Sequence, residues 1–241
     1  MEWLAKHSDS LSVLTSFGTL FLWFVYAQLL YKGYRRQRQP RLIINRGKKK
    51  DMNALCIISN MSAEPIFLEY IVAKLETSKG TITMDVTDYE QDYDNRGNVV
   101  DPDKRKSDGE PHPVPERVRD NTRQGPLQPG EYLHIGTFHN IIRRLAKTEN
   151  VELDGHRPIG DMEFRRLTLQ LIGVYGPEDL PMGAERSFRL DAQDRHCDLT
   201  PETWHTEHKN TRFQRIKLRN KLIRLNESNF SVSSTIRQPR S

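Results

Sequence analysis

The chain has 241 residues, which leaves room for one domain with its own hydrophobic core and for further segments outside it. Its formal net charge of +5 hides an uneven distribution: residues 32–50 hold nine Lys and Arg and no acid, residues 51–208 hold 29 acidic and 18 basic residues, and residues 209–241 hold nine basic residues and one acid. A DNA-binding domain would carry its positive charge on the folded body, so we expect no nucleic-acid partner. Two cysteines, Cys56 and Cys197, are too few for a disulfide-built fold.

An uncharged segment of 22 residues lies between Asp9 and Lys32. As a helix it would be roughly 33 Å long, enough to cross a hydrocarbon core of about 30 Å. We therefore predict a transmembrane helix over residues 10–31, preceded by a short extracytoplasmic N-terminus over residues 1–9. The alternatives are a buried helix of a soluble domain and a cleavable signal peptide ending at Ala27. Apolar residues that continue to Leu30 and the lack of a positive leader argue against the signal peptide.

The basic segment over residues 32–50 predicts the direction in which the span crosses the membrane. Nine positive charges follow the span and a single lysine, Lys6, precedes it, so the C-terminal side is expected in the cytoplasm, at the inner (plasma) membrane. Lys and Arg next to an anionic leaflet are each stabilised by about 1 kcal/mol. The residues expected to contact anionic lipid headgroups are Lys32, Arg35, Arg36, Arg38, Arg41, Lys48, Lys49 and Lys50.

Small hydroxyl residues form one face of the predicted span, at the helical spacing i, i+3, i+4 and i+7. They are Ser12, Thr15, Ser16 and Thr19. Such a stripe lets a second helix approach closely and hydrogen-bond, which favours a homodimer or packing against another protein's helix. The alternative is that each hydroxyl bonds a carbonyl of its own helix.

The pattern of residues 41–195 predicts a mainly β domain. Short apolar or alternating segments, bounded by Gly, Pro, Asn and Ser, are expected to form antiparallel strands rather than the parallel sheet of an α/β fold. One short helix is expected at 138–148. We interpret the whole as an Ig-like β-sandwich. The expected strands are 41–45, 54–59, 66–77, 81–87, 131–138, 166–175 and 184–190.

Residues 88–130 interrupt this pattern with ten acidic residues, seven basic residues and six of the 13 prolines. A segment with so few apolar residues buries too little surface to offset its ordering entropy, so we predict a mobile insertion. The alternative is that part of it forms an ordered loop over the edge of the sandwich. Long insertions of this kind are often where a partner binds.

The C-terminal region predicts a basic amphipathic helix over residues 200–226 and a disordered tail over 227–241. Thr200, Pro201 and Glu202 have the pattern of a helix start. Residues 211–225 hold six basic residues interleaved with apolar ones. Three interpretations of this helix are open: it lies on the anionic leaflet, it packs on the acidic body of the same or another subunit, or it contacts nucleic acid.

The sequence contains no recognisable catalytic, phosphate-binding or dinucleotide-binding motif, and we expect no catalytic residues and no cofactor. The weak candidates for a metal site are His196, Cys197, His205 and His208, whose spacing matches no common zinc site. Asp92, Asp94, Gly97 and Asp103 resemble part of a calcium loop, but Arg96 would put a positive charge where the ion should sit.

This layout is similar to that of bacterial inner-membrane proteins with one N-terminal helix and a small cytoplasmic β-domain. From it we expect a single-pass membrane protein that acts as a non-enzymatic interaction module for an unidentified protein partner. One alternative is an accessory or regulatory subunit of a membrane transport or envelope complex. A second alternative, from a different class, is a small metal-dependent enzyme.

Overall fold

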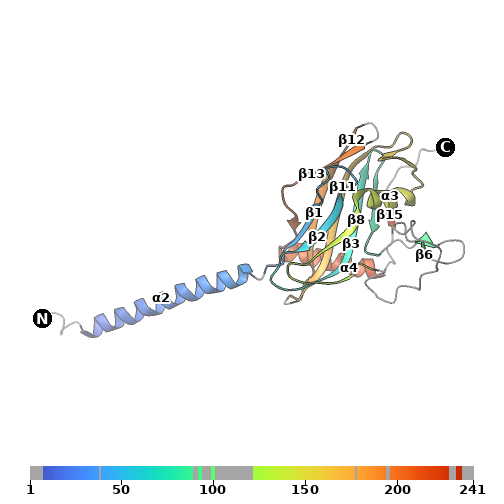
Figure 1. Ribbon diagram of the computed structural model, residues 1–241. Helices are drawn as coiled ribbons and strands as arrows, with labels where there is room; N and C mark the ends of the chain where they lie inside the picture. Colours follow the sequence, from blue (N-terminus) through green and yellow to red (C-terminus); the bar gives the residue numbers. More distant parts are fainter. Residues whose placement is uncertain are drawn as a thin grey trace. The chain divides into compact units, whose positions relative to one another are not determined.

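The structure is a computed structural model of the chain. It describes residues 8–37, 39–88, 92–93, 99–100, 122–176, 178–193, 196–227 and 232–234. The chain divides into two compact units, Met1–Gln39 and Pro40–Ser241 (Figure 1). The first is an apolar helix and the second is mainly β with antiparallel sheets, as the sequence predicts.

The first unit is built on one helix, α2, which spans Ser8–Gln37. It extends the predicted 22-residue span by about half a turn at its start and by nearly two turns at its end. The extension takes in the first basic residues after the span, Lys32 and Arg35. Straight-chain residues such as these lose little rotamer freedom in a helix, so nothing local stops the helix before the sequence reaches Pro40.

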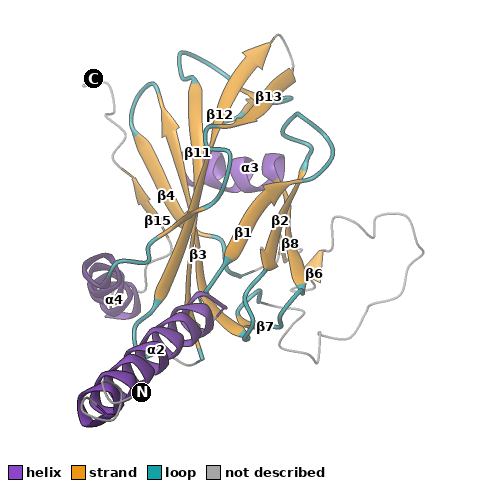
Figure 2. Ribbon diagram, turned by 90° about the vertical axis from the view of Figure 1, so that its left-hand side faces the viewer, coloured by secondary structure: helices purple, strands orange, loops and turns teal. Residues whose placement is uncertain are grey.

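The smaller sheet of the second unit has three strands in the order β1-β2-β8, and all its pairings are antiparallel (Figure 2). They are β1 (Leu42–Arg46), β2 (Leu55–Asn60) and β8 (Tyr132–Thr137). Every second side chain is directed inward: Leu42 and Ile44 on β1 are fully buried, as are Cys56 and Ile58 on β2. The period of two in the sequence is therefore the period of one buried sheet face.

The larger sheet has eight strands, six of them in the order β13-β12-β11-β3-β4-β15. Two short strands join it from the side: β14 pairs with β12, and β7 pairs with β3. Its strands are β3 (Ile66–Thr77), β4 (Thr81–Asp85), β7 (Gly125–Leu127), β11 (Phe164–Tyr175), β12 (Met182–Gln193), β13 (His196–Pro201), β14 (Glu207–His208) and β15 (Val232–Ser234).

A single hydrophobic core joins the two sheets. Side chains of β1 and β2 share one buried cluster with those of β3, β11 and β12, among them the predicted inward residues Leu167, Leu169 and Leu171. Helix α3 (Phe138–Thr148) closes the cluster and matches the predicted range 138–148. The hydroxyl of Thr137 caps α3 by accepting a hydrogen bond from the Asn140 N–H, and Phe138 packs edge-on against Phe188 with ring centroids 4.8 Å apart.

The predicted helix start at Thr200 is wrong. Thr200 and Pro201 end strand β13, where Pro201 pairs with Phe188 of β12. A proline is tolerated there because β13 is the last strand in the sheet order. The helix α4 begins twelve residues after Thr200 and spans Arg212–Glu227.

Two further predictions concern segments that the structure describes only in part. Within the predicted insertion 88–130, Asp88 bridges to Thr122, and Gly125–Leu127 forms β7 in the larger sheet, so this end of the segment belongs to the domain. Strands β5 (Asp92–Tyr93) and β6 (Val99–Val100) pair with each other. In the predicted disordered tail, β15 pairs with β4, which corrects the prediction for these three residues. The predicted mobility of 101–121 and the disorder of 228–231 and 235–241 fall outside the described residues.

Candidate functional site

The side chains of α2 face outward on all sides. Every described side chain from Ser12 to Arg35 is exposed, including Leu14, Phe21 and Trp23 at 66–70%. This 24-residue stretch has a mean hydropathy of 1.6, and none of it is buried, whereas the core helix of a soluble protein is mostly buried. The helix is therefore long and apolar enough to cross a membrane, a criterion that a signal sequence near the N-terminus also meets.

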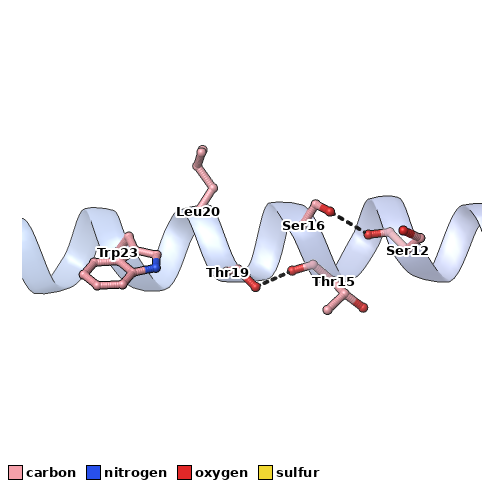
Figure 3. Close-up of a pocket in the computed structure, with 6 residues that line it drawn as sticks. All are labelled: Ser12, Thr15, Ser16, Thr19, Leu20 and Trp23. Atoms are coloured by element: carbon pink, nitrogen blue, oxygen red, sulfur yellow. Dashed lines mark hydrogen bonds between the residues drawn. The ribbon is translucent and has the colours of Figure 1, made fainter.

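The hydroxyl stripe of α2 lines a shallow hollow on the helix surface together with Leu20 and Trp23; Figure 3 shows these six residues. Two of its hydroxyls bond their own helix: Ser16 donates to the carbonyl of Ser12 at 2.9 Å, and Thr19 donates to the carbonyl of Thr15 at 2.8 Å (Figure 3). The small side chains leave the helix surface accessible along this face. A second helix could approach there without breaking either bond.

The basic residues expected at the membrane surface do not form one segment. Lys32, Arg35 and Arg36 belong to α2, Arg38 lies outside the described residues, and Arg41 directly precedes β1. The exposed residues Lys48, Lys49 and Lys50 follow β1 at its opposite end. The carbonyl of Lys50 accepts a hydrogen bond from Leu199 of β13 at 2.8 Å. Strand β1 thus separates Arg41 from the three lysines.

Helix α4 packs on the outer face of the larger sheet. Leu218, Leu222 and Leu225 form a second buried cluster with Ile172 of β11, and Tyr70 of β3 packs against it. Figure 2 shows the helix α4 beside the larger sheet. The helix is introduced by a capping box, in which the hydroxyl of Thr211 accepts from the Gln214 N–H and the Gln214 side chain accepts from the Thr211 N–H. The inner face of this helix therefore packs on the β-rich body of its own chain, which was one of the three interpretations of the sequence.

Two of the six basic residues of α4 take part in this packing. Arg215 forms an ion pair with Glu178 and donates to the main-chain oxygens of Leu180 and Pro181. Lys221 donates to the side-chain oxygen of Gln170. Burial lowers the pKa of Lys221, and the nearby Glu185 opposes this effect. These two cations serve the docking of the helix and are not available to a partner.

The other basic residues of α4 are exposed. Phe213 is 80% exposed and Ile223 is 48% exposed on the same helix. No acidic residue occurs between Arg212 and Leu225. The outer face of α4 therefore combines positive charge with exposed apolar surface; its exposed basic residues are Arg212, Lys217, Arg219 and Arg224.

The four metal candidates do not lie together. His196 pairs with Gln193 near one end of β12, whereas His208 pairs with Ala184 near the other. Nine residues along a strand correspond to roughly 30 Å. His208 instead bonds the main-chain oxygen of Leu42 through Nε2 at 2.8 Å. Among the described residues, no group of three or more His, Cys, Asp and Glu is arranged to hold a metal ion. Of the calcium-loop residues, Asp92 lies in β5, and Asp94, Gly97 and Asp103 fall outside the described residues.

A different set of histidines meets at one end of the domain, and the sequence analysis did not find it. The rings of His139 on α3, His156 between β9 (Leu153–Asp154) and β10 (Arg157–Pro158), and His196 on β13 follow one another at centroid distances of 5.2 and 5.9 Å. Nδ1 of His156 accepts a hydrogen bond from the Cys197 N–H at 3.2 Å. Burial lowers the pKa of His156; Asp51 opposes this shift, and His196 adds to it. The three residues are far apart in the sequence, and no spacing signal links them.

A cleft of about 710 Å³ opens beside His156. Its walls come from the β9–β10 hairpin, the start of β11 and the end of β12, and they include Arg157, Arg189 and Asp191. Arg189 and Asp191 pair with each other at 2.9 Å, so these two charges of the wall compensate each other. Cys197 also lines the cleft, but burial and the nearby aspartates raise the pKa of its thiol to about 11, which leaves it protonated and unreactive near neutral pH.

Comparison of the chain with protein-family models, with curated proteins and with solved structures finds no match.

Proposed function

We propose that this chain is a single-pass membrane protein in which α2 anchors the β-rich unit at the cytoplasmic face of the inner membrane. The observation that supports this proposal is the exposure of the apolar side chains of α2, since the stretch Ser12–Arg35 has no buried part. Leaving this much apolar surface in water is unfavourable by about 25 cal/mol per Å², whereas a bilayer removes it from water. The charge distribution supports the orientation, because the nine basic residues of 32–50 would have to be translocated in the opposite one.

The β-rich unit serves in this proposal as an Ig-like sandwich. In the immunoglobulin fold, strands A, B and E share one sheet, and strands C, F and G share the other. If β1, β2, β3, β8, β11 and β12 are taken as A, B, C, E, F and G, the orders β1-β2-β8 and β12-β11-β3 are compatible with A-B-E in one sheet and G-F-C in the other, which supports the proposal. Strand β4 then occupies the place of the extra strand next to C in variable-type domains.

The role proposed for this unit is a non-enzymatic interaction module that recruits a protein partner to the membrane. Ig-like sandwiches present loops and outer sheet faces on a rigid scaffold. The cleft near His156 has one compensated ion pair, Arg189 with Asp191, and an inert thiol, which suits a binding surface better than a reaction centre. An accessory subunit of a membrane complex is the second candidate, and the accessible hydroxyl face of α2 favours it as a contact for another protein's helix.

Topology reporters fused after Ser241 test the anchor and its direction. We expect a fluorescent protein to be bright and alkaline phosphatase to be inactive, and we expect the chain to stay in the membrane during carbonate extraction. An N-terminal sequence of the mature chain that begins at Gln28 would identify a cleaved signal peptide and contradict the proposal. Crosslinking in intact cells, followed by mass spectrometry, tests the interaction role. A partner crosslinked to the β-unit supports the module, and one crosslinked only to α2 supports the accessory subunit.

A further inference from the structure

We infer that the outer face of α4 is a second membrane contact, which binds the surface of an anionic bilayer. The inference rests on the proposed anchor, and it assigns a partner to a helix whose inner face is already occupied. Leu218, Leu222 and Leu225 are buried against the larger sheet, so the charged outer face is held in a fixed position on the domain.

The outer face has the composition that a bilayer surface accommodates. At about 100° per residue, Phe213 and Ile223 lie within roughly 80° of each other on the helix circumference. The exposed basic residues flank this apolar strip, Arg212 and Arg219 on one side and Lys217 and Arg224 on the other. An interfacial helix places its apolar strip at the boundary of the acyl chains and its basic residues among the headgroups. No acidic residue stands between Arg212 and Leu225, so this stretch of the helix itself carries only positive charge.

The position of α4 on the domain also brings it close to the point where the chain enters from the anchor. The carbonyl of Leu42, the first residue of β1, bonds His208, and His208 pairs with Ala184. Gly183, next to Ala184 in β12, lies directly against α4: a Cβ at this position would lie only 2.6 Å from the side chain of Leu218. Four residues, 38–41, separate α2 from β1, and this connection spans at most roughly 18 Å. Leu42 and the middle of α4 therefore lie at the same end of the β-rich unit, the end at which the chain enters it.

The lysines that the sequence suggested for this contact are less well placed than α4. The carbonyl of Lys50 lies beside Leu199, which pairs with Leu190 of β12. Leu190 is six residues along the strand from Ala184, or roughly 20 Å. An acidic protein surface would also attract the basic residues of α4, but it would leave Phe213 in water unless it supplied an apolar pocket. An anionic lipid surface can attract the basic residues of α4 and also remove Phe213 from water.

The test uses the full chain in lipid nanodiscs, with a bimane fluorophore on the variant Asn220→Cys and brominated lipid as the quencher. Asn220 is exposed in the middle of the outer face, and the native Cys56 and Cys197 are buried, so labelling is selective. We expect quenching in discs that contain phosphatidylglycerol and much less in discs of phosphatidylcholine alone. A label on Asp154→Cys, in β9 of the hairpin that contacts the end of β12 away from α4, should stay unquenched in both. Salt at about 0.5 M, where the Debye length falls below roughly 5 Å, should weaken the quenching at Asn220.

The charge variant is Arg212→Gln with Lys217→Gln and Arg219→Gln. If each cation contributes its usual amount near an anionic leaflet, the docking equilibrium constant falls roughly fivefold per charge, or roughly 100-fold for the three. The matched control removes three exposed cations elsewhere on the domain, by Lys79→Gln, Arg143→Gln and Arg165→Gln, and should keep the quenching. Both variants should retain the circular dichroism spectrum and unfolding midpoint of the parent chain, which separates loss of binding from loss of folding.

The outcomes distinguish this inference from the proposed anchor. If the chain does not co-purify with the discs, the anchor is wrong and α4 has no tether. If the chain is inserted but the label at Asn220 remains unquenched in anionic discs, the inference is overturned while the anchor stands. Crosslinking from position 220 to another protein in intact cells, together with that unquenched label, would assign the face to a protein partner. Equal quenching by neutral and anionic discs would also overturn it.

Discussion

Arg186 of β12 donates a hydrogen bond of 2.6 Å to the main-chain oxygen of Ile44 in β1, and so joins the larger sheet to the edge of the smaller one. Its guanidinium also reaches the carbonyls of Thr203 and Trp204 at 3.2 and 3.4 Å. The N–H of Ile44 is bonded by the hydroxyl of Thr206 at 2.9 Å. The outer edge of β1 is thereby closed by side chains, which blocks the pairing of a foreign strand at this edge.

We expect Arg186→Ala to destabilise the domain by about 3 kcal/mol, because it removes the guanidinium donor from the buried carbonyl of Ile44 and from two part-buried carbonyls, and removes packing on Phe188. Urea unfolding of the full chain in mild detergent, followed by far-UV circular dichroism, measures the change. The control is Arg189→Ala on the same strand, whose side chain is 59% exposed. It should cost less than about 1 kcal/mol. Equal losses in the two variants would mean that the contact between Arg186 and Ile44 does not stabilise the fold.

Gly173 is needed because β3 passes close to it at an irregularity in the pairing of β11. A Cβ at this position would lie 2.5 Å from the main-chain oxygen of Phe67. Backbone cannot move aside as a side chain can, so we expect Gly173→Ala to cost about 2 kcal/mol or more. Gly176→Ala, where a Cβ meets nothing within 4 Å, is the matched control and should be close to neutral. Thermal unfolding midpoints compare the two, and similar midpoints would contradict the close approach.

The docking of α4 depends on its leucines. Leu218→Ala removes a side chain that is 5% exposed, and we expect it to weaken the docked state by about 2 kcal/mol. Faster hydrogen exchange confined to residues 212–227 is the expected signature, since the main core does not include these residues. Phe213→Ala, on the exposed side, should leave the exchange rates unchanged. Acceleration throughout the β-sheets would show instead that α4 is part of the global folding unit.

The pH dependence of stability should reflect the histidines at the cleft. Burial lowers the pKa of His156 and of His139 in the folded chain below the unfolded value of about 6.5. The folded state therefore binds fewer protons than the unfolded state between the two pKa values, and the free energy of unfolding decreases as the pH falls through this window. Protonation of His156 would also break its bond from the Cys197 N–H, because Nδ1 would no longer accept.

Urea unfolding at pH 7.5 and 5.5 checks this expectation. The parent chain should lose stability on acidification, and His156→Asn, which keeps an acceptor near the position of Nδ1 but does not titrate, should lose less. His134→Asn provides the control, because His134 is exposed on β8. A stability loss in His156→Asn as large as that of the parent would assign the pH dependence to other groups.

The local elements were predictable where the side-chain pattern had one dominant cause. Strand β3 and helix α3 have the predicted bounds, because Ile66–Thr77 and Phe138–Thr148 each present one continuous buried face. The start of α4 was missed although Thr211 and Gln214 form a recognisable capping box. Thr200 and Pro201 resemble a helix start, but the pairing of β13 with β12 outweighs that local preference.

The candidate surfaces were less predictable, because they depend on which strands are neighbours. The outer side of β11 shows this: Gln170 and Ile172 have the alternation of a solvent-facing row, yet α4 covers them. The meeting of His139, His156 and His196 likewise follows from the packing of α3, the β9–β10 hairpin and β13. No pairwise signal in one sequence encodes such contacts.

The sequence alone was enough to identify an apolar helix of membrane-spanning length, the cationic segment behind it and a mainly β body, because hydropathy, charge and the period of two act over neighbouring residues. Only the tertiary structure decided that Arg186 closes the edge of β1, that the metal candidates lie at opposite ends of β12, and that α4 buries three leucines and exposes four cations. These relationships depend on sheet order and register, which arise from packing between residues distant in the chain.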